Sequence, residues 1–156
     1  SVTPSPVRAA PARGRGERIL LVEDEKELRL LGQRVLAQDG YVVFSADSVN
    51  AAKALYAREG GNFDLLFSDV ILPDGDGAQL AEWFCSQRPG APVLLCSGYT
   101  DERIRWENIQ TQGYRFLQKP FAAQDLLRTV RDILDARQGR PISPTNPHTN
   151  PAGETT

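Results

Sequence analysis

Five short apolar runs alternate with longer amphipathic stretches along the chain. The runs have the length of strands, and they cover Ile19–Val22, Tyr41–Phe44, Asp64–Phe67, Pro92–Cys96 and Tyr114–Leu117. Three of them are apolar on both faces, as expected of strands that are buried between helices. Five strand-then-helix units predict an α/β protein with a doubly wound parallel sheet and helices on both of its faces.

The stretches between the runs repeat apolar residues at helical spacing. In the first stretch Leu28, Leu31 and Val35 share one face, and Gly40 is placed to end the helix. Ser48 is placed to cap the second helix. The remaining helices are marked by Leu80 and Phe84, by the less clearly patterned range Asp101 to Gln110, and by Leu126, Val130, Ile133 and Leu134.

The two ends of the chain differ in composition from the middle. Residues 1–16 are mostly Pro, Ala, Arg and Gly, which predicts a disordered linker. Residues 139–156 combine four prolines with polar residues, and we expect disorder there as well. The domain is therefore expected over residues 17–138. The sequence contains no Met, not even at position 1, so we interpret it as a segment of a longer polypeptide.

Charge and composition argue against several classes of function. The net charge is −2, whereas a domain that binds nucleic acid directly usually has a basic face. No apolar run is long enough to cross a bilayer, so no membrane contact is expected of this segment. Cys85 and Cys96 suit a reducing cytoplasm better than a structural disulfide, so a cytoplasmic location is expected. The lone His148 lies in the Pro-rich end, which leaves no histidine for a metal site or a catalytic triad in the folded part.

Polar side chains follow the carboxyl ends of four of the expected strands. Glu23 and Asp24 follow the first strand, Asp69 the third, Ser97 the fourth and Lys119 the fifth. One carboxylate after a strand is often only a helix cap, but capping does not explain the joint pattern. Crowded carboxylates raise one another's pKa unless a cation lies between them, and Mg²⁺ binds through carboxylates, water and phosphate oxygens. A carboxylate can also take a phosphoryl group as a nucleophile, with a lysine and a hydroxyl binding its oxygens.

From about Arg18 to Arg137 the chain resembles a response-regulator receiver domain. The stretches that carry the resemblance are ILLVEDE (Ile19–Glu25), LLFSDVILPDGDG (Leu65–Gly77), VLLCSGYT (Val93–Thr100) and FLQKPF (Phe116–Phe121). The resemblance implies a flavodoxin-like, five-stranded sheet in the order 2-1-3-4-5. It also implies a phosphoacceptor in a two-component or phosphorelay system, which takes a phosphoryl group from the phosphohistidine of a histidine kinase or a histidine phosphotransfer domain. The resemblance also allows a second receiver domain as a partner, in a homodimer.

The resemblance also implies roles for single residues. Asp69 corresponds to the phosphoacceptor, and Glu23 and Asp24 to the acidic pair that binds Mg²⁺, with Asp24 favoured as the direct ligand. Asp69 itself and the backbone carbonyl of Ile71 complete the protein's share of the metal shell. Lys119 corresponds to the lysine that acts with Asp69 on the phosphoryl group.

Two further positions concern signal transmission and geometry. Ser97 corresponds to the switch hydroxyl and Phe116 to the switch aromatic, which is Tyr in many members of the family. A signal that needs a tyrosine hydroxyl is therefore excluded, while ring rotation coupled to Ser97 stays open, as does a static core role for Phe116. The resemblance further implies a cis peptide bond between Lys119 and Pro120.

Other hypotheses fit the residues less well. A phosphohydrolase of the haloacid-dehalogenase type would need Asp-x-Asp directly after the first strand, and residues 23–26 lack it. An EF-hand reading of Asp74–Gly77 fails because its first and twelfth positions are Leu72 and Trp83. A degenerate receiver that serves only as an interaction module is disfavoured by the complete set of site residues.

The parent protein allows two interpretations. The linker, the missing Met and the lack of an effector domain favour the C-terminal receiver of a hybrid sensor histidine kinase. A stand-alone response regulator is the alternative. In either case the domain itself is expected to be a phosphoacceptor rather than a turnover enzyme, although a hybrid parent would be a kinase.

Overall fold

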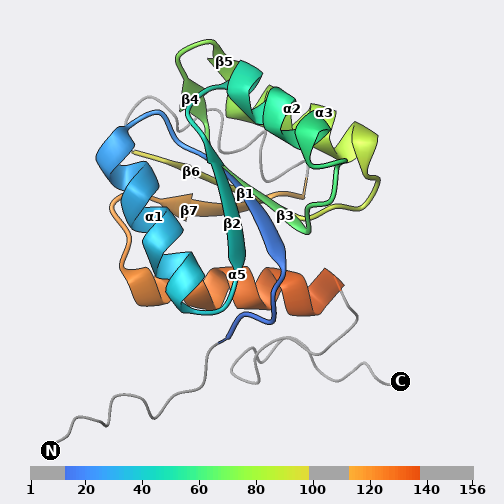
Figure 1. Cartoon of the computed structure of the whole chain (residues 1–156). Coiled ribbons are helices and arrows are strands. Elements are labelled where there is room, and N and C mark those ends of the chain that lie inside the picture. Colours follow the sequence, from blue (N-terminus) through green and yellow to red (C-terminus); the bar gives the residue numbers. More distant parts are fainter. Residues whose placement is uncertain (1–12, 99–112, 138–156) are drawn as a thin grey trace, which may run out of the picture.

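A five-stranded parallel sheet forms the centre of the molecule (Figure 1). The computed structural model describes residues 13–98 and 113–137. The strands lie in the order β2-β1-β3-β6-β7, and their bounds are Arg18–Val22 for β1, Val42–Ala46 for β2, Leu65–Asp69 for β3, Val93–Ser97 for β6 and Arg115–Gln118 for β7. Since β6 and β7 are the fourth and fifth strands of this sheet along the chain, the predicted order 2-1-3-4-5 is confirmed.

Helices cover both faces of the sheet, as predicted (Figure 1). Helices α2 (Val49–Arg58) and α3 (Gly77–Gln87) lie on one face, and α1 (Lys26–Gln38) and α5 (Ala123–Arg137) on the other. The helix expected over residues 101–110 lies outside the described residues, as do most of the two predicted tails. None of the helices within residues 13–98 and 113–137 has the length and apolar composition needed to cross a membrane.

The core is divided by the sheet into two clusters. Alternate residues of each strand point to opposite faces, so Leu20 and Val22 pack under α2 and α3, while Ile19 and Leu21 pack under α1 and α5. All five residues of β3 are buried, as are all five of β6. Complete burial on both faces explains why these central strands read as uninterrupted apolar runs in the sequence.

Local signals at the helix ends act as predicted. The hydroxyl of Ser48 accepts a hydrogen bond from the backbone N–H of Ala51 at 3.1 Å, which caps α2. Gly40 lies just after α1 with φ of 101°, a left-handed conformation that glycine adopts without strain. The carboxylate of Asp76, for which no capping role was predicted, caps α3 by accepting from the N–H of Ala78 at 2.7 Å.

The segment between β3 and α3 has regular structure of its own. Two-residue strands β4 (Ile71–Leu72) and β5 (Gly75–Asp76) pair antiparallel and form a short hairpin. Strands of two residues are too short to show an alternating pattern of apolar and polar positions. The hairpin was therefore not predicted.

Helix α1 buries less of its apolar face than expected. Its only buried residue is Leu36, while Leu28 and Leu31 are 38% and 51% exposed. The face predicted from Leu28, Leu31 and Val35 exists, but it lines an open cavity instead of a packed interface.

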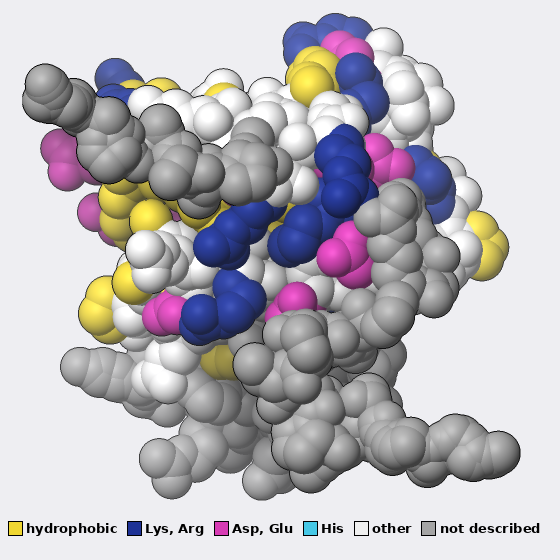
Figure 2. All heavy atoms as spheres, turned by 90° about the horizontal axis from the view of Figure 1, so that it is seen from below, with side chains coloured by type: hydrophobic (Ala, Val, Ile, Leu, Met, Phe, Trp, Pro, Cys, Tyr) yellow, Lys and Arg dark blue, Asp and Glu magenta, His cyan; other side chains and the backbone are white. Residues whose placement is uncertain are grey.

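The residues that enter β1 are bonded to the end of α1 and to a side chain of α5. The N–H of Gly14 donates to the carbonyl of Asp39 at 2.6 Å, and Arg131 of α5 donates to the carboxylate of Glu17 at 2.9 Å. Figure 2 shows Lys and Arg side chains gathered on the face seen from below, with Asp and Glu side chains among them. Positive charge on this face is therefore interrupted by negative charge.

Candidate functional site

Three carboxylates meet at the carboxyl edge of the sheet. Asp69 is the last residue of β3, and Glu23 and Asp24 directly follow β1, its neighbour in the sheet. One oxygen from each carboxylate lies within 4.8 Å of the others. Glu23 and Asp69 are buried, whereas Asp24 is exposed. The sequence analysis predicted this cluster, and its oxygen ligands are of the kind that Mg²⁺ prefers.

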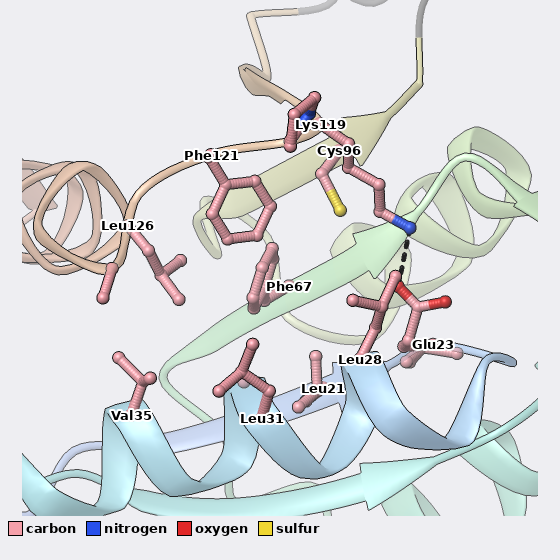
Figure 3. A pocket seen from close by; sticks show the side chains of 14 residues that line it. Leu21, Glu23, Leu28, Leu31, Val35, Phe67, Cys96, Lys119, Phe121 and Leu126 are labelled. Atoms are coloured by element: carbon pink, nitrogen blue, oxygen red, sulfur yellow. Dashed lines mark hydrogen bonds and ion pairs between the residues drawn. The ribbon is translucent and has the colours of Figure 1, made fainter.

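Lys119 is the positive partner of this cluster. Its Nζ atom donates to Oε1 of Glu23 at 2.8 Å and to Oδ2 of Asp69 at 3.1 Å. Figure 3 shows the side chain reaching from the end of β7 toward Glu23. The following peptide bond to Pro120 is cis, as predicted. Lysine has three N–H donors, and these carboxylates use two of them.

Burial and crowding change the proton affinities at the site. Burial, together with the nearby charge of Glu23, raises the pKa of Asp69 from 3.8 to about 6, although Lys119 opposes the change. Burial alone would lower the pKa of Lys119, but its hydrogen bond to Glu23 and the surrounding negative charge raise that pKa above its ordinary value. Lys119 thus stays charged, and one ammonium faces three carboxylates. A divalent cation would correct this imbalance.

Glu23 is held more firmly than Asp24. Besides its bond to Lys119, its carboxylate accepts from the N–H of Glu25 at 3.1 Å, and its backbone carbonyl accepts from Arg29 at 3.0 Å. Asp24 is exposed and therefore freer to turn toward an ion. The sequence analysis did not predict the Glu23–Lys119 pair, because these residues lie 96 positions apart.

The other predicted site residues lie nearby but have different contacts. Ser97 ends β6 and is buried, and its hydroxyl donates to the carbonyl of Gly98 at 3.0 Å. Ile71 begins β4, two residues after Asp69. Phe116 lies in β7 and packs against the core cluster under α2 and α3. The structure thus brings Lys119 and the three carboxylates together, places Ser97 on the strand next to that of Asp69, and leaves Phe116 packed against the core.

Close packing holds the backbone of Asp69. A Cβ atom at Gly77 would overlap the carbonyl oxygen of Asp69, so only glycine fits at the start of α3. The same carbonyl accepts a hydrogen bond of 2.8 Å from the buried hydroxyl of Ser68. The sequence analysis assigned no role to Gly77 or Ser68. A glycine in the first turn of a helix, where other residues are more stable, was the one available signal.

An apolar cavity of about 320 Å³ opens beside the site (Figure 3). It lies between α1 and the start of α5, above β1 and β3. Glu23 and Lys119 form its polar end, and Leu28, Leu31 and Phe121 lie along its walls. The site therefore combines a charged cluster that could hold a cation and a phosphoryl group with an adjoining apolar surface.

Comparison with known proteins agrees with this geometry. The family model for the response regulator receiver domain matches residues 19–131. The sensor kinase CckA of Brucella abortus is 33% identical over 117 residues, which make up 75% of this chain and 12% of that protein. The transcriptional regulatory protein CusR of Escherichia coli K12 is 32% identical over 117 residues, which make up 75% of this chain and 51% of CusR. The chain thus spans about half or less of these relatives.

Solved structures have the same fold. A CheY-like receiver domain protein from Methanospirillum hungatei is 27% identical with a TM-score of 0.72, and the match covers 80% of this chain and 98% of that one. The receiver domain of the hybrid histidine kinase CckA is 32% identical with a TM-score of 0.62, and the match covers 75% and 98% of the two chains.

Proposed function

Because the chain belongs to the response regulator receiver domain family, we propose that it accepts a phosphoryl group on Asp69 in a Mg²⁺-dependent reaction. One observation carries the proposal. Three carboxylates lie within 4.8 Å of one another at the end of the sheet, and a single lysine bonds to two of them.

The metal would be held by Asp24, by Asp69 and by the backbone carbonyl of Ile71, with Glu23 beside them. Glu23 is already bonded to Lys119 and to the N–H of Glu25, which supports Asp24 as the direct ligand. Bound Mg²⁺ would neutralise negative charge on the phosphoryl oxygens. These residues are all hard oxygen donors, so they fit this ion.

The covalent bonds that change in the transfer are those of Asp69 and of the phosphorylated donor. A carboxylate oxygen of Asp69 forms a bond to phosphorus, and the bond from phosphorus to the donor's imidazole nitrogen breaks. The electron pair of the broken bond stays on that nitrogen, and an acyl phosphate forms on Asp69. Lys119 and the hydroxyl of Ser97 then donate to phosphoryl oxygens, for which the hydroxyl must leave the carbonyl of Gly98.

Chemical labelling tests the acceptor. Acetyl phosphate and Mg²⁺ should add one phosphoryl group, measured by intact mass, and alkali should remove it. Asp69→Asn should abolish the addition, whereas Asp47→Asn, which changes an exposed carboxylate at the start of α2, should not. Labelling of Asp69→Asn to the same extent as the parent would refute the assignment.

The metal ligands are tested separately. Asp24→Ala should weaken Mg²⁺ binding more than Glu23→Ala, because loss of a direct ligand costs more than loss of a neighbouring carboxylate. Titration followed by amide NMR measures both. A parent domain whose spectrum does not respond to Mg²⁺ would show that the cluster is no metal site.

The apolar surface beside Asp69 supports a protein donor. Leu28 and Leu31 of α1 are exposed large hydrophobic residues, and the cavity lies between them and α5. A histidine kinase or histidine phosphotransfer domain could cover this surface while bringing its phosphohistidine to Asp69. Leu31→Ser should slow transfer from such a donor and leave labelling by acetyl phosphate unchanged.

We further propose that the parent protein is a hybrid sensor kinase and that this domain lies in the cytoplasm. The similarity to the sensor kinase CckA supports this, but CusR is almost as similar, so a stand-alone regulator is the alternative. The domain bounds proposed are 17–138. Sequencing the gene on both sides of this segment would decide between the two parents.

A further inference from the structure

Asp74 joins two segments that the sequence separates widely. It lies in the turn between β4 and β5, five residues after Asp69. Its Oδ1 accepts from the N–H of Val49 at 2.8 Å, and its Oδ2 accepts from the N–H of Asn50 at 2.9 Å. Val49 and Asn50 are the first two residues of α2. The hairpin after β3 is therefore bonded to the beginning of α2.

These bonds complete the N-terminal cap of α2. The first N–H groups of a helix have no acceptor within the helix. The side chain of Ser48 accepts from the N–H of Ala51. The carboxylate of Asp74 accepts from the N–H groups of the two residues before Ala51. A helix N-terminus also favours negative charge. The two N–H donors accordingly hold the pKa of Asp74 below its usual range.

A second contact ties the same two segments together. A Cβ atom at Gly75 would lie 3.0 Å from Cγ2 of Val49, so the hairpin backbone lies close to this side chain. On its other side the hairpin is joined to α3, since Asp76 caps that helix and the N–H of Gly77 donates to the carbonyl of Val70. The hairpin is thus held at both neighbouring helices.

The pairing within the hairpin is itself short. It contains two residue pairs, and a hairpin of that length is not stable alone in water. The side chain of Ile71 is 52% exposed, although Leu72 is buried. The backbone of Ile71 is the part of the hairpin that the proposed metal site uses.

We propose that Asp74 is a positioning residue for this site, which holds the hairpin against α2 and thereby sets the place of the Ile71 carbonyl relative to Asp69. This inference rests on the proposed Mg²⁺-dependent function. It assigns Asp74 no contact with the metal or the phosphoryl group.

Two matched variants separate positioning from simple helix capping. Asp74→Ala removes both bonds to α2. Ser48→Ala removes another cap of the same helix and leaves the hairpin bonds in place. Asp47→Ala, at an exposed carboxylate near the same helix end, controls for the loss of one negative charge. Each variant is compared with the parent for melting temperature, for Mg²⁺ affinity by amide NMR and for the rate of labelling by acetyl phosphate.

Asp74→Ala and Ser48→Ala should lower the melting temperature by similar amounts. Only Asp74→Ala should also weaken Mg²⁺ binding, by about tenfold, as is usual when a residue that orients a ligand is lost. Asp74→Asn should have an intermediate effect because its side chain keeps one acceptor oxygen, and it replaces Asp74→Ala if that variant does not fold.

The outcomes distinguish this inference from the function on which it rests. A parent domain that binds no Mg²⁺ would overturn both. A parent that binds Mg²⁺ normally, with Asp74→Ala and Ser48→Ala affecting its affinity equally, would overturn the positioning role alone and leave the phosphoacceptor function standing.

Discussion

The two faces of the sheet are packed to different degrees. Helices α2 and α3 cover one face, and helices α1 and α5 cover the other. Under α2 and α3, Tyr56 lies with its ring 5.0 Å from that of Trp83, 5.8 Å from Phe84 and 5.9 Å from Phe63. Both helices there begin with side-chain caps. On the opposite face α1 has no side-chain cap, and a cavity of about 320 Å³ lies between part of it and α5. We call these the closed face and the open face.

The two faces contribute differently to the site around Asp69. The closed face holds the backbone on which the acidic site is built, through Gly77 and the hairpin. The open face leaves apolar surface next to the same site, and this is the surface on which we propose that a donor protein binds. On that proposal, stability and recognition depend on opposite faces of one sheet.

The largest expected effect comes from removing a ring on the closed face. Phe84→Ala should lower the free energy of unfolding by about 3–5 kcal/mol, because Phe84 is fully buried. Leu31→Ala on the open face should lower it by less than about 1 kcal/mol, since half of that side chain is exposed. Urea unfolding measures both values. Equal losses would remove the distinction between the faces.

The acidic site between the faces should itself be a source of instability when no metal is bound. In the folded protein the pKa of Asp69 is raised from 3.8 to about 6, so its charged form is disfavoured by folding. The free-energy cost of burying the charged form of Asp69 is present above pH 6 and disappears as the pH falls toward 4. In EDTA at pH 7.5, Asp69→Asn should therefore unfold with a free energy higher by up to about 3 kcal/mol.

The check is a series of urea unfolding curves between pH 4.5 and pH 7.5, values chosen to bracket the raised pKa at about 6. The advantage of Asp69→Asn should shrink steadily as the pH is lowered. A difference that does not vary with pH would mean that the buried charge is not its cause.

Effects smaller than that of Phe84→Ala are expected from one glycine substitution on each face. Gly77→Ala, at the start of α3, should destabilise the domain by about 1–3 kcal/mol, since its Cβ would overlap the carbonyl of Asp69. Gly32→Ala, inside α1, should stabilise it by about 0.5–1 kcal/mol. There a Cβ would meet only Cδ2 of Leu21, at an ordinary 3.5 Å. Thermal unfolding shows whether each variant is more or less stable than the parent. Stability changes in the same direction for both variants would contradict this account of the faces.

The sequence predicted the parts of the fold in which local pattern and burial agree. Residues 65–69 and 93–97 are buried on both faces, so their strands appear as apolar runs. Ser48 and Gly40 act within their own helix ends, where short-range signals suffice. The acidic cluster was predictable because the carboxyl ends of parallel strands share one edge. The strand order, by contrast, came from the family resemblance, since short apolar runs do not specify their neighbours.

The features that were missed depend on contacts between distant segments. Asp74 caps a helix that begins 25 residues earlier, and Glu23 pairs with a lysine 96 residues later. The local sequence around these residues does not predict either contact. The apolar face of α1 was predicted from its spacing. Whether another helix covers that face depends on how closely α5 approaches, and no pattern within α1 contains that information.

The anchoring of the residues before β1 has a consequence for how the domain can be tethered. Arg131 of α5 donates to the carbonyl of Arg13 and to the carboxylate of Glu17, so the incoming chain lies against α5 at the amino end of the sheet. Asp69 lies at the opposite end. A neighbouring domain attached through this segment would thus be connected at the end of the sheet opposite Asp69, and the attachment would not cover Asp69. The length of the linker would then set the effective concentration at which that neighbour meets Asp69.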